Sequence, residues 1–469
     1  MPPGGLTARI QQMTTLSRFN HMLSTSDEMG TLIENAAAEL NGAAYDSNEA
    51  SLLRLLRRNY EEARKLPPEF VTRSAQVSGQ AHAAWVKARA NNDFAAFQPW
   101  LEQVVELCQE MAELYGYEDE KYDALLDKYE LGMKTADVRA IFDAVKAELV
   151  PLRQAIAERG TAVDDSIVHQ PFDVETQKEF ARYITNVVGY DFTRGHLGTV
   201  VHPFATSFSR DDARITTRWY PDFLNPSLFG ALHESGHAMY EQGTHPDLAR
   251  TPLARGTSLG IHESQSRMFE NLVGRSRGFW QAHYPKLQSL FPEQLGQRTA
   301  EEFYRAINKV QPSYIRVEAD ELTYNFHIIL RFELEQAMLN GELAARDLPA
   351  AWNAKMEELL GVVPPTDSQG CLQDVHWTRP GFGYFPTYAL GNLYGAQFFE
   401  TAVAQSPAIL DELNQGQTTR LLAWLRENIH QHGRKFTPGE LVERVTGQPL
   451  SHAAFMRYAK AKFTELYNL

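Results

Sequence analysis

The chain has 469 residues, of which 43% are hydrophobic and 22% charged, so it has ample material for a large buried core and no sign of a disordered, collagen-like or disulfide-rich build. Acidic residues outnumber basic ones by 59 to 45, and the net charge of -14 disfavours nucleic acid or an anionic membrane as a partner. We therefore expect the partner to be a small molecule or a peptide.

Cysteine content and the N-terminal segment bear on the compartment. Only Cys108 and Cys371 are present, which excludes a disulfide framework and a cysteine-based zinc site. The first thirty residues carry charges such as Arg9 and Arg18 and lack the apolar run of a signal peptide. No stretch of about 18 uncharged apolar residues is present for a membrane-spanning helix. We expect a cytoplasmic protein that binds no membrane.

Helical periodicity dominates the chain from its beginning. In segment 51–64 the apolar residues recur at helical spacing, and Pro67 and Pro68 then stop the predicted helix. Residues 1–160 read as a series of such helices, rich in Glu and Lys and without a chemical motif. We interpret them as a helical wall or lid.

The residue pattern changes at residues 190–220. There Thr, Val, Ile, Phe and Trp cluster between glycines and prolines, as is typical of two or three short strands. Helical patterning then resumes to Leu469, apart from a loop-rich stretch at 361–386. No linker-like segment interrupts the chain. We predict one large, mainly α-helical domain over residues 1–469, with a small β-sheet and with its catalytic region at 190–400.

The segment His233-Glu234-Ser235-Gly236-His237 carries the first candidate chemistry. Residues four apart on an α-helix point the same way, so His233 and His237 can place two imidazole nitrogens on one metal ion. Glu234 lies about 100° further round the helix, where it can reach a metal-bound water as a general base. Gly236 costs a helix about 1 kcal/mol relative to Ala, which predicts that another backbone approaches closely there. The alternative is a chance pattern of two core histidines and a surface glutamate.

A catalytic zinc site needs a third protein ligand. The metzincin pattern is excluded, because it requires Gly and His where this chain has Tyr240 and Gly243. His245 lies in a predicted turn, where an ordinary surface histidine is expected. Glu263 is the stronger candidate, since it lies on a second predicted helix that follows Gly256-Thr257-Ser258. The predicted site is therefore His-His-Glu.

With these residues the sequence resembles the thermostable zinc carboxypeptidases of the Taq type, distant relatives in fold of the angiotensin-converting enzyme and neurolysin group. The resemblance rests on six motifs that occur in family order across positions 202–377. They are His202-Pro203-Phe204; Asp212-Ala213-Arg214-Ile215-Thr216; the segment from His233 to His237; His262-Glu263-Ser264-Gln265; Ile315-Arg316-Val317-Glu318-Ala319-Asp320; and Gly370-Cys371-Leu372-Gln373-Asp374-Val375-His376-Trp377.

The resemblance implies a large helical domain with a deep substrate groove, a small sheet near the metal-binding helix, and a homodimer. It implies that Glu263 is the third metal ligand and Glu234 the catalytic base, while the other motifs line the groove. The implied cofactor is one Zn²⁺ per chain, with Co²⁺ or another divalent ion as the alternative.

Residues of the later motifs are candidates for contact with a peptide. Arg316 is our first choice to recognise a free C-terminal carboxylate, because a planar guanidinium holds a carboxylate through two parallel hydrogen bonds. Gln373 and His376 are candidates for the same task. The alternative for Arg316 is a helical ion pair with Asp320, four residues further on.

Four other residues have a functional and a structural interpretation. Arg214 and His202 are candidate substrate contacts, with a strand-surface charge and structural support as the respective alternatives. Tyr384 and Tyr388 lie in a predicted aromatic loop at 381–388, and Tyr388 is the preferred hydrogen-bond donor to a developing oxyanion. Aromatic core packing is the alternative for both tyrosines.

The predicted function is that of a metal-dependent carboxypeptidase. Glu234 would take a proton from the metal-activated water and deliver it to the leaving amine, while Tyr388 or His376 stabilises the oxyanion. Endopeptidase or dipeptidase action at the same site is one alternative. A catalytically silent peptide-binding protein is another, and the intact Glu234 argues against it because binding alone needs no base.

Overall fold

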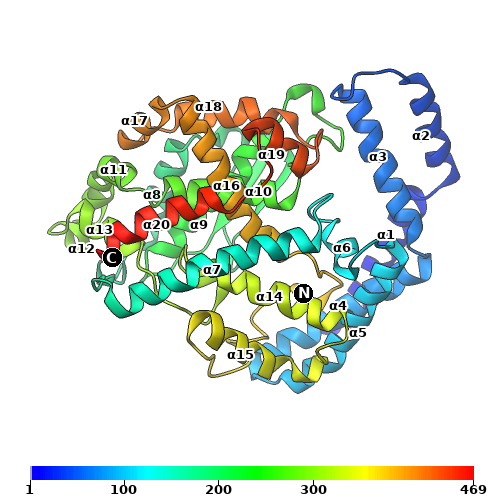
Figure 1. Cartoon of the computed structure of the whole chain (residues 1–469), viewed down its shortest axis with the longest axis horizontal. Helices are drawn as coiled ribbons and strands as arrows, with labels where there is room; N and C mark the ends of the chain where they lie inside the picture. The colour runs from blue at the N-terminus through cyan, green and yellow to red at the C-terminus, as the bar shows by residue number, and fades with distance from the viewer. Residues whose placement is uncertain (1–2) are drawn as a thin grey trace. The chain divides into compact units, whose positions relative to one another are not determined.

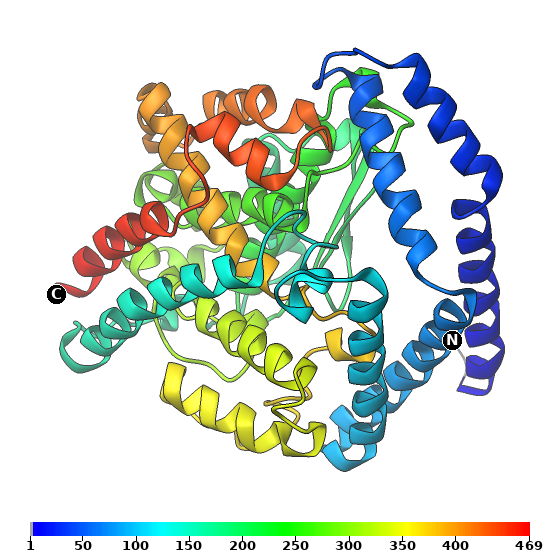
Figure 2. The ribbon, with the colours of Figure 1, turned by 45° about the vertical axis from the view of Figure 1, so that its right-hand side comes forward.

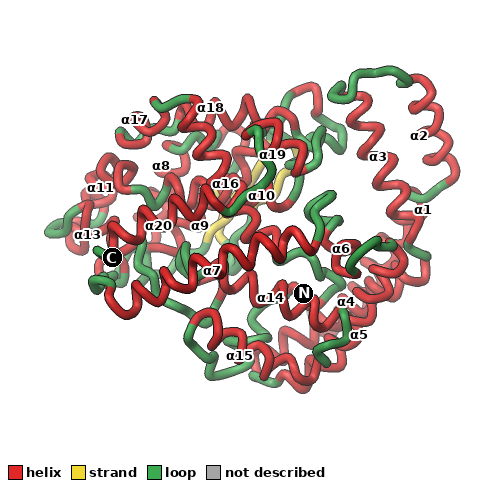
Figure 3. The backbone as a smooth tube through the Cα atoms, in the orientation of Figure 1, coloured by secondary structure: helices red, strands yellow, loops and turns green. Residues whose placement is uncertain are grey.

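The computed structural model describes residues 3–469 and is mainly α-helical, with one small three-stranded sheet (Figures 1 and 3). This confirms the predicted fold class. The described residues fall into two compact units, and each unit is assembled from three separate segments of the chain. Within the described range, no helix combines the length and apolar character needed to cross a membrane.

The first unit contains residues 3–139, Pro312–Ala319 and Phe326–Pro386. Helices α2 and α3 run side by side in two views (blue in Figures 1 and 2). The helices of this unit are α1 (Leu6–Ser24), α2 (Asp27–Glu39), α3 (Asn48–Lys65), α4 (Pro68–Asn91), α5 (Phe94–Tyr115), α6 (Lys121–Leu126), most of α14 (Tyr324–Leu339) and α15 (Leu348–Leu360).

Local capping residues set where helices of the first unit begin and end. Ser26 accepts a hydrogen bond from the backbone N–H of Met29 at the start of α2. Asp93 does the same for Ala96 at the start of α5. Asn92 precedes it with φ of 53°, a left-handed conformation that Asn tolerates. The chain thus reverses between α4 and α5, which pack against each other.

The second unit contains Ala140–Gln311, Asp320–Asn325 and Thr387–Leu469. It holds most of α7 and the sheet. Its helices are α7 (Thr135–Arg159), α8 (Val174–Val187), α9 (Asn225–Gly243), α10 (Leu259–Arg267), α11 (Arg277–Leu290), α12 (Pro292–Leu295), α13 (Ala300–Ile307), α16 (Pro386–Gln405), α17 (Ala408–Asn414), α18 (Thr419–Asn428), α19 (Pro438–Thr446) and α20 (Ala453–Tyr467).

The sheet has the strand order β1-β3-β2 and lies within the segment where strands were predicted. Strand β1 (Leu197–Thr199) pairs in parallel with β3 (Asp212–Thr217), which pairs antiparallel with β2 (Ala205–Ser209). Helix α9 packs against β3 and β2. The Thr217 hydroxyl donates to the carbonyl of Ser227 at 3.1 Å, so the start of α9 is tied to the end of β3.

Candidate metal centre and active site

Helix α9 presents His233, Glu234 and His237 from its middle turns. Pro226 lies in its first turn, where the missing N–H of proline is harmless. The apolar face of the helix is buried in the second unit through Leu228, Leu232 and Met239. The apolar face therefore anchors the helix in the core, and the two histidines and Glu234 lie on other faces.

Helix α10 crosses α9 at Gly236. A Cβ atom on Gly236 would lie 2.5 Å from both the carbonyl oxygen of Gln265 and the Cα of Ser266. This confirms the predicted close approach of another backbone. Helix α10 begins at Ser258, whose hydroxyl accepts a hydrogen bond from the N–H of Ile261. The crossing brings Glu263, one turn into α10, beside the two histidines.

Three potential ligand atoms converge at this crossing. The Nε2 atoms of His237 and His233 lie 3.3 Å and 3.6 Å from Oε2 of Glu263. One ligand atom from each of the three residues lies within 4.8 Å of the other two. Ligands about 2.0–2.1 Å from a tetrahedral Zn²⁺ are separated by roughly 3.3–3.4 Å. The residues thus fit a divalent ion of this size, and we call His233, His237 and Glu263 the metal-site triad.

A second layer of charged groups surrounds the metal-site triad. Oε2 of Glu270 lies 2.8 Å from Nδ1 of His233, the ring nitrogen opposite the one directed at Glu263. Arg267 donates from Nε to Oε1 of Glu263 at 2.7 Å and from Nη1 to Oε2 of Glu270 at 3.0 Å. Glu270 belongs to a π-helix, Met268–Val273, that directly continues α10. Single π-turns occur often at functional sites, and this one carries the carboxylate that orients His233.

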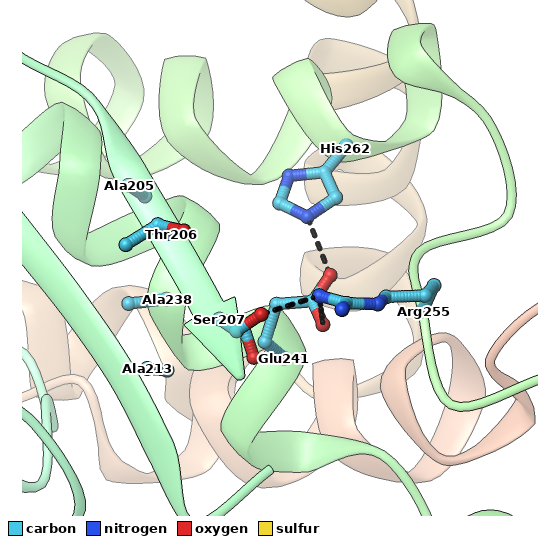
Figure 4. A pocket seen from close by; sticks show the side chains of 8 residues that line it. All are labelled: Ala205, Thr206, Ser207, Ala213, Ala238, Glu241, Arg255 and His262. Carbon is cyan, nitrogen blue, oxygen red and sulfur yellow. Dashed lines mark hydrogen bonds and ion pairs between the residues drawn. The ribbon is translucent and has the colours of Figure 1, made fainter. Parts of the chain in front are cut away.

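His237, the second histidine of the metal-site triad, is contacted by His262 rather than by a carboxylate. Nδ1 of His237 lies 2.6 Å from Nδ1 of His262, and Nε2 of His262 lies 2.9 Å from Oε1 of Glu241. His262 and Glu241 line a cavity of about 320 Å³, whose wall also includes β2 and Arg255. Figure 4 shows the two side chains directed at each other. Arg255 donates to the carbonyl of Ser207 at 2.8 Å.

Burial and nearby charges raise the proton affinity of Glu234. Burial raises the pKa of Glu234 to about 7, and the carboxylates of Glu263 and Glu270 act in the same direction, while His233 opposes them. A carboxylate with a pKa near neutrality can both accept and return a proton at physiological pH.

The two histidines of the triad differ in charge preference. Burial, with His262 and His233 close by, lowers the pKa of His237 to about 4, so this ring is neutral at pH 7. Burial also opposes protonation of His233, but the carboxylates of Glu263 and Glu270 outweigh it and raise the pKa to about 9. A metal ion that binds this ring near pH 7 must displace its proton.

Helix α16 carries Tyr388 and contacts Glu263 of the metal-site triad. A Cβ atom on Gly391 would lie 2.5 Å from Cγ of Glu263, so α16 passes directly over this side chain. Tyr388 precedes Gly391 by three residues and is on the same face of the helix. Its ring centroid is 6.4 Å from that of Tyr324. The sequence predicted a loop through Tyr388, but α16 already begins at Pro386, because proline suits the first turn of a helix.

Arg214 and His202 lie at the surface of the sheet region. Arg214 makes a two-pronged ion pair with Asp212, with Nε–Oδ1 and Nη2–Oδ2 distances of 2.7 Å and 2.8 Å. Its side chain is 52% exposed. His202 is exposed in the connection between β1 and β2. The structure brings Arg214 together with its motif neighbour Asp212 rather than with the metal-site triad.

In the first unit, Arg316 is part of a buried charge cluster. It belongs to a short 3-10 helix, Arg316–Glu318, and donates from Nε and Nη2 to Oδ1 of Asp374 at 3.1 Å and 2.9 Å. Arg331 donates from Nε to Oδ2 of the same carboxylate at 2.7 Å. Gln373 accepts a hydrogen bond from the Arg316 backbone N–H at 2.8 Å. The carboxylate beside Arg316 is therefore Asp374, whereas Asp320 accepts from the N–H groups of Leu322 and Thr323.

His376 and Tyr384 border the same cluster. Nδ1 of His376 lies 3.7 Å from Oδ1 of Asp374. Burial, aided by Arg316 and other arginines, lowers the pKa of His376 to about 3, although Asp374 acts in the opposite direction. The ring centroid of Tyr384 is 5.2 Å from that of His376 and 5.2 Å from that of Tyr129. Arg316, Gln373, His376 and Tyr384 thus come together in the first unit, although they belong to three separate segments of the sequence.

Sequence reasoning assigned no role to several residues of these two clusters. Arg267 follows Glu263 by four residues, and this helical spacing is a signal that would have found it. Glu241 likewise follows His237 by four residues on α9. Glu270 follows Arg267 by three residues, but its contact with His233 depends on how the π-helix meets α9 and has no signal in the sequence. Arg331 is distant in sequence from Asp374 and is found only from the fold.

The fold and the site together define a class, that of mainly helical metallopeptidases with a His-Glu-x-x-His helix and a carboxylate from the following helix. Sequence comparison identifies the family. The profile of the carboxypeptidase Taq (M32) metallopeptidases matches residues 1–463, and the chain belongs to this family. The resemblance carried by the six motifs is confirmed.

Individual members of the family align with this chain over its whole length. The chain is 42% identical over 479 residues to thermostable carboxypeptidase 1 of Thermus thermophilus, which covers 100% of this chain and 93% of the relative. It is 38% identical over 468 residues to carboxypeptidase 1 of Bacillus subtilis, with coverage of 100% and 93%. Among solved structures, the M32 carboxypeptidase of Deinococcus radiodurans R1 matches with a TM-score of 0.95 at 40% identity, covering 100% of this chain and 94% of that one.

Proposed function

We propose that this protein is a metal-dependent carboxypeptidase that removes single C-terminal residues from peptides. The observation that carries the proposal is the convergence of two Nε2 atoms and one carboxylate oxygen, 3.3 Å and 3.6 Å apart, in a chain of this family. His233, His237 and Glu263 would hold one Zn²⁺ per chain. Co²⁺ or another divalent ion is the alternative, because a His-His-Glu site accepts several such ions.

Glu234 is the proposed general base. A divalent ion held by His233, His237 and Glu263 would lower the pKa of a bound water to about 7 and polarise the scissile carbonyl. Glu234 takes the proton of the attacking water and gives it to the leaving amine. Burial raises its pKa to about 7, so this carboxylate takes up a proton more readily than an ordinary glutamate, as the role of a base requires.

Tyr388 and His376 are the proposed donors to the oxyanion that forms when water adds to the carbonyl. Tyr388 is supported by its place one helical turn before Gly391, where α16 touches Glu263. His376 is supported by its lowered pKa, because a neutral imidazole keeps one N–H as a donor without becoming a fixed charge.

Arg316 is the proposed anchor for the C-terminal carboxylate of the substrate. Arg316 and Arg331 both donate hydrogen bonds to the carboxylate of Asp374. A planar guanidinium can hold a carboxylate through two parallel hydrogen bonds, which supports this role for Arg316. Asp374 orients the guanidinium, and Gln373 fixes the backbone at Arg316. Gln373 and the adjacent Tyr384 would share the contact with the terminal residue of the peptide.

Arg214 and His202 are proposed to contact the peptide at a distance from the scissile bond. Their exposed positions on and beside the sheet support access to a substrate. Arg214 would exchange part of its ion pair with Asp212 for that contact, at little cost because solvent screens exposed ion pairs.

We further propose that residues 1–469 act as one catalytic domain, with residues 1–160 as a helical wall, and that the enzyme is a cytoplasmic homodimer without nucleic-acid or membrane partners. The interleaved segments of the two units support a single working domain. Cys108 and Cys371 are buried free thiols, as suits a reducing compartment. An apolar stripe on α1, formed by Leu16, Phe19 and Leu23 at 61%, 55% and 71% exposure, supports a contact with a second copy of the chain.

Product analysis of one N-blocked peptide tests the proposed function. We expect stepwise loss of single residues from the C-terminus, arrest of the reaction by a chelator and recovery on addition of Zn²⁺ or Co²⁺. His237→Ala should abolish both activity and stoichiometric metal, while the control His245→Ala, an exposed histidine beyond the same helix, should retain both. Internal fragments would identify an endopeptidase instead, and an intact peptide would identify a silent binding protein.

A further inference from the structure

The contacts of His237 extend outwards through two further side chains. Nδ1 of His237 and Nδ1 of His262 are 2.6 Å apart, and Nε2 of His262 is 2.9 Å from Glu241 (Figure 4). Two ring nitrogens at this distance share one proton, because two N–H groups would repel and two lone pairs would form no bond. The direction of this hydrogen bond therefore decides which nitrogen of each ring carries its proton.

The direction follows from the geometry of the metal-site triad. Nε2 of His237 faces Oε2 of Glu263 at 3.3 Å, so Nε2 is the nitrogen that must present its lone pair to an ion. The single proton of the neutral ring is then on Nδ1, and His237 donates to Nδ1 of His262. Since that nitrogen accepts, the proton of His262 is on Nε2, where it is donated to the carboxylate of Glu241.

Glu241 is itself held in place by the surrounding backbone. It is 7% exposed, and its Oε1 also accepts a hydrogen bond from the N–H of Gly256 at 3.3 Å. Arg255 lies 3.8 Å from Oε2 of Glu241 and donates to the Ser207 carbonyl of β2 (Figure 4). The carboxylate is thus fixed by α9, by the segment that precedes α10 and by the sheet.

We infer that Glu241 and His262 are positioning residues that fix the tautomer and ring orientation of His237, and so set how tightly the site retains its metal. The inference rests on the proposed function, because it takes His237 as a metal ligand. Outer groups of this kind act by orienting the ligand and raising its basicity, and their loss typically weakens metal affinity by about 10- to 100-fold. The site then has two different supports, a carboxylate directly on His233 and a histidine-carboxylate pair on His237.

Substitutions at His262 separate the hydrogen bond from mere packing. Leucine removes the acceptor, whereas asparagine restores one, because its amide oxygen lies two bonds from Cβ, as Nδ1 of histidine does. We expect His262→Leu to raise the dissociation constant for Zn²⁺, measured by competition with a chromophoric chelator, by about 10- to 100-fold. We expect His262→Asn to recover most of that loss. His283→Leu is the matched control, since His283 is also buried in the second unit with two hydrogen bonds, to Tyr183 and Gly416.

The outcomes separate this inference from the proposed function. If the parent binds Zn²⁺ and His237→Ala does not, the metal site is established whatever His262 does. If His262→Leu binds Zn²⁺ as tightly as the parent does, or if the Leu and Asn variants lose affinity equally, the positioning role of His262 is overturned. Should His262→Leu fail to fold, nitrogen-15 NMR of the histidine-labelled, zinc-loaded parent decides the question. A proton on Nε2 of His262 supports the proposed hydrogen-bond direction, and a proton on Nδ1 contradicts it.

Discussion

Oε2 of Glu270 lies 2.8 Å from Nδ1 of His233, and Arg267 ties the same carboxylate oxygen to Glu263. Two of the three triad residues are therefore joined through an outer ion pair. We expect Glu270→Ala to raise the dissociation constant for Zn²⁺ by about 10- to 100-fold, measured by chelator competition. Glu270→Gln keeps an acceptor for His233 and should lose less. Glu293→Ala, on the exposed part of α12, is the control, and an unchanged affinity in Glu270→Ala would contradict the role.

Glu234→Gln should separate chemistry from binding. The amide has nearly the size of the carboxylate but cannot take the proton of the water, so we expect kcat to fall by about 10²- to 10⁴-fold or more. Metal content and thermal stability should stay close to those of the parent. Elemental analysis and steady-state kinetics check this, and turnover within a few-fold of the parent would remove Glu234 as the base.

Arg316→Ala tests the carboxylate anchor. Loss of a hydrogen bond to a charged group costs about 1.5–3 kcal/mol, so kcat/KM on free-acid peptides should fall roughly ten- to two-hundred-fold. C-terminally amidated peptides should already be poor substrates for the parent. The deciding measurement is the ratio of free-acid to amide cleavage, because general damage lowers both rates alike. An unchanged ratio would leave Arg316 as a structural partner of Asp374.

Glu335 should make the stability of the protein depend on pH. It is fully buried and accepts hydrogen bonds from Tyr122, Trp377 and the Gly383 N–H, yet burial raises its pKa to about 7. Between the ordinary value of 4.5 and 7 the folded state holds a proton that the unfolded state releases. The stabilisation is therefore complete below pH 4.5 and is lost as the pH rises through 7, by about 3 kcal/mol in all.

Comparison with Glu335→Gln isolates this effect. Glutamine cannot ionise, so the free energy of unfolding of the parent should fall relative to that of the variant between pH 5 and pH 8. Urea unfolding at both pH values measures the difference, and Glu342→Gln at an exposed position serves as control. Parallel pH profiles of the parent and Glu335→Gln would show that Glu335 is ionised throughout.

The apolar stripe on α1 predicts how the protein associates. We expect the parent to sediment as a dimer, and the double variant Phe19→Glu, Leu23→Glu to sediment as a monomer, because two charges would have to be buried in the contact. Leu410→Glu, at a single exposed leucine of α17, should leave the dimer intact. A monomeric parent would contradict the homodimer, and a dimeric double variant would exclude this stripe as the contact.

Local signals made much of the fold and the centre of the site predictable. Helix α9 follows from the spacing of its histidines, and the helix that carries Glu263 follows from the cap at Ser258. The sheet follows from the clustered β-branched residues at 190–220. Each of these signals involves residues that are close together in the sequence, so it can be recognised without knowledge of the tertiary structure.

The outer contacts could not be predicted, because they depend on how separate elements meet. Glu270 reaches His233 through a π-helix that sequence spacing does not indicate. Asp374 pairs with Arg316 from 58 residues away, where the four-residue spacing had pointed to Asp320. In both places the partner is determined by tertiary packing.

The helix crossing at Gly236 has a consequence for the spacing of the three candidate ligands. Main-chain atoms of α10 lie where a side chain on Gly236 would be, so contact between two backbones sets how closely α10 approaches α9. Any larger residue at this position would have to push α10 away. Because Glu263 is on α10 and both histidines are on α9, such a shift would separate the carboxylate from the two imidazoles. The absence of a side chain at Gly236 is therefore what allows residues of two helices to face a single point.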